Sequence, residues 1–128
     1  MQDASWLLDD AAPRAATITE ATGVSRDGWC EPEVGLTIAA ASAVALCQLR
    51  IWLKPEPART STRFVARFGD HEPFAFELPH DRMVVVHAAC AAAPGEVVQG
   101  SIACDNEVSD KGIDVRRLSF KLDGIRFA

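Results

Sequence analysis

One segment of this 128-residue chain, Val44 to Leu53, constrains the fold more than any other. Its apolar residues recur at every second position: Ala45, Cys47, Leu49, Ile51 and Leu53. Gln48 and Arg50 interrupt the positions between them. A period of two residues is that of a β-strand with one face in a core and the other toward solvent. The segment therefore predicts a half-buried strand, which the proline-rich stretch 54–57 ends.

The rest of the chain repeats this rhythm of short apolar segments separated by turn residues. Alternation over 63–68 and Phe74–Leu78, joined by Gly69–Pro73, predicts a hairpin. The other expected strands are Thr17–Thr22, Val34–Ala40, Met83–Cys90, Val97–Cys104 and Val115–Leu122. Closely spaced strands without an amphipathic helix predict an all-β fold, a two-sheet antiparallel β-sandwich of jelly-roll type. The alanine-rich stretch Ala39–Ala45 has the propensity for a helix, which is the main alternative to this assignment.

The length fits one domain, so we expect residues 16–128 to form the sandwich and 1–15 to form a short helix or a loose segment. The formal net charge is −5 and the basic residues are scattered, which argues against nucleic acid as a partner. The longest run of low polarity, Leu36–Leu46, is too short for a membrane span. No signal-peptide pattern precedes it, so we expect a cytoplasmic protein.

Four cysteines, Cys30, Cys47, Cys90 and Cys104, are widely spaced, and three of them lie inside apolar strand-like segments. We interpret them as reduced core residues. A metal site would need ligands at short spacing, and the nearest approach, His87 with Cys90, places its members on opposite faces of a strand. Glycine-rich phosphate loops are also missing. The sequence therefore predicts no metal and no cofactor.

The second face of the Val44–Leu53 strand is the candidate ligand site. Trp52 shares that face with Gln48 and Arg50, and an indole beside an amide and a guanidinium suits a sugar ring, which stacks and also forms hydrogen bonds. We expect Arg63 and Arg67 from the following strand to extend this face. The alternative is that Trp52 packs under a loop or against a partner.

A family resemblance rests on two further motifs. Asp27-Gly28-Trp29 precedes an apolar strand, and the chain closes with Asp114-Val115-Arg116-Arg117-Leu118-Ser119-Phe120. Together with the Trp52 strand, these segments resemble an accessory β-sandwich module attached to bacterial glycosyltransferases and methyltransferases of surface-polysaccharide pathways. The resemblance covers Gly23 to the C-terminus and implies a non-catalytic, carbohydrate-binding-like fold.

The residues of these motifs also have structural interpretations, which we favour. Asp27-Gly28 is a turn dipeptide, and Trp29 behind it can close one end of the core. Arg116 can form a partly buried, bidentate ion pair with Asp114 or another carboxylate, which closes the fold.

Two functions follow from the sequence. The first is a non-catalytic, carbohydrate-binding-like accessory module with a saccharide as ligand. The second is a structural or protein-interaction domain that packs against another chain or a second copy, because small-residue strands such as 88–93 can pack flat. An enzyme is not expected, because no nucleophile, acid and base converge in the sequence.

Overall fold

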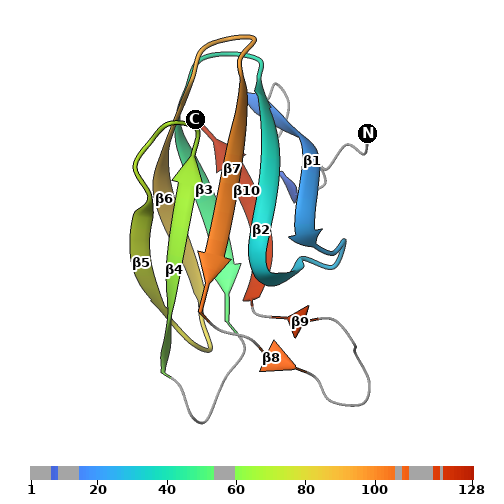
Figure 1. Cartoon of the computed structure of the whole chain (residues 1–128), viewed down its shortest axis with the longest axis vertical. Coiled ribbons are helices and arrows are strands. Elements are labelled where there is room, and N and C mark those ends of the chain that lie inside the picture. Colours follow the sequence, from blue (N-terminus) through green and yellow to red (C-terminus); the bar gives the residue numbers. More distant parts are fainter. Residues whose placement is uncertain (1–6, 9–14, 54–59, 106–107, 110–116, 119) are drawn as a thin grey trace.

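The computed structural model describes residues 7–8, 15–53, 60–105, 108–109, 117–118 and 120–128. Within these ranges every regular element is a β-strand (Figure 1). The strands are β1 (Ala16–Val24), β2 (Trp29–Ala40), β3 (Val44–Trp52), β4 (Ser61–Phe68), β5 (Phe74–Pro79), β6 (Met83–Ala92), β7 (Val97–Cys104), β8 (Val108–Ser109), β9 (Arg117–Leu118) and β10 (Phe120–Phe127).

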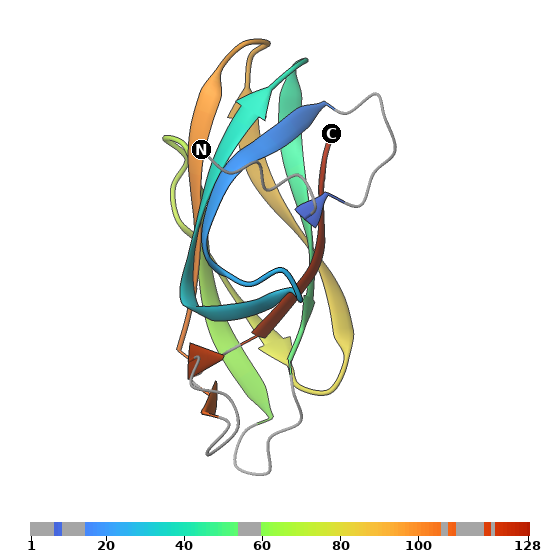
Figure 2. The same cartoon turned by 90° about the vertical axis from the view of Figure 1, so that its right-hand side faces the viewer.

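The long strands form two layers, which are seen edge-on in Figure 2. Strands β5, β4, β7 and β2 follow one another in one layer, where β1 also pairs with β2, and β10, β3 and β6 form the other. Among the described strands, ladder pairing between the two layers occurs where Cys30 and Trp29 of β2 pair with Phe120 and Lys121 of β10. All these pairings are antiparallel. The structure thus confirms the predicted all-β, two-sheet antiparallel sandwich.

The core fills the space between the layers, because alternate side chains of each strand point inward. In β4 the inward positions are Thr62, Phe64, Ala66 and Phe68, all buried. The β4–β5 hairpin pairs as predicted from Ser61 with Pro79 to Ala66 with Phe74. Leu7 and Leu8 are buried in the same core, and Leu8 bridges Ile125 in parallel.

The start of β3 departs from the predicted alternation. Cys47, Leu49, Ile51 and Leu53 are buried as expected, but Ala45 is exposed. The N–H groups of Ala45 and Leu46 both donate to the Ala128 carbonyl, at 2.8 and 2.9 Å, and the pairing with β6 shifts between Val44 and Leu46. This irregularity places two successive residues on one side of the strand. The alanine-rich stretch Ala39–Ala45 is not helical but spans the end of β2, a bend and the start of β3.

The described part of the predicted strand Val115–Leu122 belongs to two elements. Arg117–Leu118 pairs with β8, and β10 runs from Phe120 to Phe127. Between Leu122 and Gly124 the strand β10 contains a bulge. Asp114, Val115 and Arg116 lie outside the described residues, so the expected pairing of Arg116 with Asp114 is not tested.

All four cysteines are free thiols, and Cys30, Cys47 and Cys90 are buried. Burial raises the pKa of each of these three thiols, so all three stay protonated at neutral pH. Cys30 Sγ donates to the Gly28 carbonyl at 3.4 Å. These three cysteines therefore act as small apolar core residues. In the part of the chain described, no helix has the length and apolar character needed to cross a bilayer.

Candidate functional site

The turn between β1 and β2 positions the first aromatic residue of the candidate site. Gly28 N–H donates to the Ser25 carbonyl at 2.8 Å, and Ser25 N–H donates to the Trp29 carbonyl at 2.9 Å. The Asp27 carboxylate accepts a hydrogen bond from Trp29 N–H at 3.1 Å, the Asx-type contact that favours aspartate in turns. The turn predicted at Asp27-Gly28 is therefore present, and it fixes where Trp29 enters β2.

Gly28 also holds this turn against β10. Its φ is +90°, and its carbonyl accepts a hydrogen bond from Leu122 N–H at 2.8 Å. A Cβ at this position would lie 2.9 Å from the Leu122 carbonyl oxygen. Only glycine combines this backbone conformation with this close approach. The close contact at Gly28 thus holds the β1–β2 turn against the start of β10.

Trp29 and Trp52 form an aromatic pair on the outer side of the sandwich. Their ring centroids are 5.8 Å apart with an interplanar angle of 74°, an edge-to-face arrangement. Both indoles are half-buried, and the residues next to them, Cys30 and Ile51, point into the core. Trp29 therefore lies on the outer face, and does not close the end of the core as the sequence had predicted.

The strand register completes a row across four strands. Lys121 of β10 pairs with Trp29 on one side and with Trp52 on the other, and Trp52 pairs with Met83 of β6. Directly paired residues point to the same face of a sheet, so all four side chains share the outer face. Met83 is 40% exposed. A lysine and a methionine thus border the two indoles.

A bulge in β10 brings an acidic group to the next row. Between Leu122 and Gly124 the register shifts, so Asp123 is the additional residue opposite Arg50 and Ile51. The Asp123 carboxylate lies 3.8 Å from the Arg50 guanidinium, and both side chains remain partly exposed. Bulges commonly redirect a side chain in this way beside functional sites. We call Trp29, Trp52, Lys121, Arg50 and Asp123 the tryptophan face.

Gln48 lies one row farther along β3 on the same face. It pairs with Arg126 of β10 and with His87 of β6. Gln48, Arg50 and Trp52 thus share one face, as predicted.

A small hollow adjoins the tryptophan face. Its volume is about 190 Å³, and its lining includes Lys121 and Asp123 together with Arg26 and Asp27 of the β1–β2 turn. Cationic and carboxylate groups therefore face one concavity beside an aromatic pair. This combination offers hydrogen-bond donors and acceptors to a polar ligand whose apolar side rests on the indoles.

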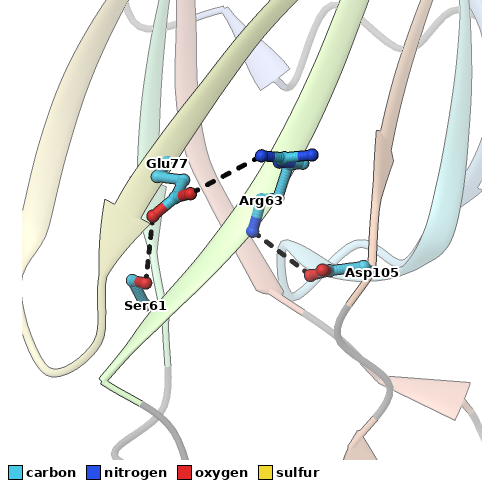
Figure 3. Close-up of polar contacts among 4 residues, drawn as sticks. All are labelled: Ser61, Arg63, Glu77 and Asp105. Atoms are coloured by element: carbon cyan, nitrogen blue, oxygen red, sulfur yellow. Dashed lines mark hydrogen bonds and ion pairs between the residues drawn. The ribbon is translucent and has the colours of Figure 1, made fainter.

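Arg63 and Arg67 do not belong to this face. They are exposed on β4, which pairs with β5 and β7 in the other layer. Arg63 lies 4.0 Å from Glu77, and its backbone N–H donates to Asp105 at 3.2 Å (Figure 3). Glu77 also accepts a hydrogen bond from the Ser61 hydroxyl at 3.2 Å. Arg63 thus links β5, β4 and the end of β7, and the expected extension of the site to β4 is not what the structure forms.

Two loop histidines have structural contacts. His71 Nε2 accepts a hydrogen bond from Ala91 N–H at 3.1 Å, and His80 Nε2 lies 2.7 Å from the Thr62 hydroxyl. Within the described ranges, no group of three or more His, Cys, Asp or Glu side chains is arranged to hold a metal ion.

The sequence reasoning missed Lys121 and Asp123 and gave Trp29 a different position. A signal for Asp123 was available: a glycine inside a strand often marks a bulge, and Gly124 follows it. Lys121 and Trp29 could not be assigned, because their positions depend on which strands pair across the sheet.

Comparison with known proteins identifies the fold. No protein-family profile matches the chain, and a search of curated proteins finds no match. A family 35 carbohydrate-binding module from an environmental isolate is similar over 100% of this chain and 85% of its own, with a TM-score of 0.51 and 11% identity. An exo-β-1,3-galactanase of Phanerochaete chrysosporium, solved with galactose, is similar over 90% of this chain, with a TM-score of 0.46 and 13% identity. This chain covers 26% of that enzyme. The chain therefore shares a β-sandwich fold with that carbohydrate-binding module.

Proposed function

We propose that this chain is a non-catalytic carbohydrate-binding module that holds a saccharide on the tryptophan face. The observation that carries the proposal is the Trp29–Trp52 pair on the outside of the sandwich, with Lys121, Arg50 and Asp123 around it. The similarity in fold to a carbohydrate-binding module supports this proposal.

The chemistry of the face suits a sugar. The apolar C–H side of a pyranose ring stacks on an indole, and its hydroxyls need both donors and acceptors around the ring. Lys121 and Arg50 supply donors, and the carboxylate of Asp123 supplies acceptors. Because the face is open and not a deep cleft, we expect modest affinity and recognition of a few sugar units.

The proposal extends to the biological setting. The resemblance of the Asp27-Gly28-Trp29 region to accessory modules favours a role beside a bacterial glycosyltransferase or methyltransferase of a polysaccharide pathway. The four free thiols favour a reducing compartment, which for such a system is the cytoplasm. The module would hold a glycan acceptor or product near the transferase that modifies it.

A binding experiment tests the proposal. Glycan-array screening of the wild-type protein identifies a ligand, and heteronuclear NMR titration then measures it. We expect Trp52→Ala to abolish the titration shifts, because the stacking surface is lost, while Arg67→Ala on the opposite layer leaves them unchanged. Equal binding by Trp52→Ala and the wild type, or no binding to any glycan of the array, would overturn the proposal. Thermal melting of both variants controls for folding.

A further inference from the structure

Three strands of the sandwich have an edge that no other described strand pairs with: β1, β5 and β6. Natural proteins protect such edges with charges, proline, bulges or short length, because open edges recruit other strands. β1 has two register shifts and carries Glu20. β5 has only six residues, which include Glu77 and Pro79. Both edges are therefore protected against pairing.

β6 lacks these protections over most of its length. Its ten residues, Met83–Ala92, contain no Asp, Glu, Lys, Arg or Pro. The register shift near its C-terminal end lies between Ala89 and Ala92, so Met83–Ala89 pairs regularly with β3. Val85 on its outer face is 49% exposed. A long, regular and uncharged edge of this kind is a template for another strand.

An apolar cavity lies beside the same edge. Its volume is about 540 Å³, and it is lined by Ala66 and Phe68 of β4, Pro73 and Phe74 of the hairpin, and Ala88 of β6, together with His71, Glu72, His87 and Ala89. Phe74 is 44% exposed. A strand added to β6 would direct every second side chain toward the mouth of this cavity. Small apolar side chains such as those of β6 itself would cover Phe74 there.

We propose that β6 pairs antiparallel with β6 of a second copy of this chain, in a register centred on His87. A two-fold axis between the two β6 strands, at His87, then joins the two three-stranded layers into one continuous sheet. Val85 lies opposite Ala89 of the second copy on each side of the axis in this register, so the pairing spans Val85–Ala89. At Ala91 the N–H donates to His71, so the β4–β5 loop covers the edge there.

The charges at the two ends of β6 favour a second copy of this chain as the pairing partner. Arg82 directly precedes the strand, with Asp81 one residue farther back. Glu96 is at the other end, where its carboxylate accepts a hydrogen bond from Ala93 N–H at 2.7 Å. The contact between His71 and Ala91 also holds the loop with Asp70 and Glu72 near that end. Antiparallel pairing places Arg82 of each copy opposite Ala92 of the other, beside these acidic residues.

The dimer would also orient the two ligand sites. A two-fold axis perpendicular to the sheet keeps both outer faces on the same side. If the proposed saccharide site is correct, two tryptophan faces then meet one polysaccharide chain or surface, which raises the apparent affinity by avidity.

Sedimentation velocity measures the association, and three paired substitutions test the interface. Val85→Lys with Ala89→Lys places lysines directly opposite one another in this register, and we expect a dimer Kd at least ~10-fold higher than that of the wild type. The control pair, Val65→Lys with Val97→Lys, puts the same charges on exposed positions of the other layer and should leave the Kd unchanged. Val85→Glu with Ala89→Lys places opposite charges together and should restore the dimer.

The outcomes are separable from those of the saccharide experiment, because sedimentation needs no glycan. A wild-type protein that stays monomeric up to about 200 µM would overturn the proposal, since association must appear by mass action. Equal Kd values for the lysine pair and its control would overturn it as well. A charge-reversed pair that associates as weakly as the lysine pair would contradict the register centred on His87.

Discussion

Strands β3 and β4 both alternate buried apolar residues with outward polar ones that include arginine, yet they place their aromatic residues on opposite sides. β4 directs Phe64 inward, where it meets Phe120 at 5.1 Å and Phe76 at 5.3 Å between ring centroids. β3 directs aliphatic residues inward and presents Trp52 outward, against Trp29. An aromatic side chain in the core stabilises the fold, whereas one on an outer face is available to a ligand.

The arginines of the two strands differ in a related way. Arg63 on β4 belongs to a contact network with Glu77 and Asp105 that links three strands. Arg50 on β3 pairs with Asp123, which a bulge places next to an aromatic pair and a hollow. The same residue type in the same pattern therefore has a structural role on β4 and a candidate binding role on β3.

The largest expected effect comes from truncating the aromatic residue of each strand to alanine. Phe64→Ala should lower the free energy of unfolding by ~3–5 kcal/mol, because it leaves a cavity among buried rings. Trp52→Ala should lower it by only about 1–2 kcal/mol, because its ring is half-buried on the outer face. Urea unfolding followed by circular dichroism measures both. If the two substitutions cost the same, Trp52 is a core residue and the comparison fails.

The sequence was sufficient to locate most strands and to predict a two-sheet sandwich, but not to say which strands pair. Period-two alternation located β3, β4 and most other strands, because alternation depends only on which side chains avoid water. The bulges at Ala45 and Asp123 were not predicted, since each depends on how the neighbouring strand pairs.

The candidate site shows the same limit. Gln48, Arg50 and Trp52 were grouped correctly because they share one strand. Arg63 and Arg67 were added on the assumption that the next strand in sequence is also next in space, but β4 lies in the other layer. Long-range pairing, between Trp29, Lys121 and Trp52, is what assembles the rest of the face.

A second prediction concerns the turn that places Trp29. Gly28→Ala should lower the free energy of unfolding by about 1–3 kcal/mol, because alanine is strained at a positive φ and its Cβ would meet the Leu122 carbonyl. The turn should shift away from β10 and separate the two indoles, so the near-ultraviolet circular dichroism should lose the signal of the pair. Gly95→Ala is the control: its φ is +86°, but no atom lies within 4 Å of the added Cβ. We expect it to lower stability less and to keep the tryptophan signal.

A third prediction measures the aromatic pair directly. In a double-mutant cycle with Trp29→Leu and Trp52→Leu, the coupling free energy should be ~0.5–1.5 kcal/mol in favour of the pair, as for other edge-to-face contacts. Chemical denaturation of the four proteins provides it. A coupling near zero would mean that the two rings are held separately by their own strands, and a saccharide would then contact only one of them.

The smallest expected effects on stability are those of removing the two arginine ion pairs. Arg50–Asp123 and Arg63–Glu77 are both solvent-exposed, so each coupling free energy for stability should be below about 1 kcal/mol and should fall as salt is added. The pairs should differ in saccharide binding instead. Asp123→Asn keeps the shape of the side chain but removes its charge, so the proposed site predicts weaker binding, while Glu77→Gln on β5 should leave the affinity unchanged. Calorimetric titration of both variants with the ligand found by glycan screening measures the difference. If Asp123→Asn binds the saccharide as tightly as Glu77→Gln does, the ligand does not contact Asp123. The Arg50–Asp123 pair would then have only a structural role, as the Arg63–Glu77 pair has on β4.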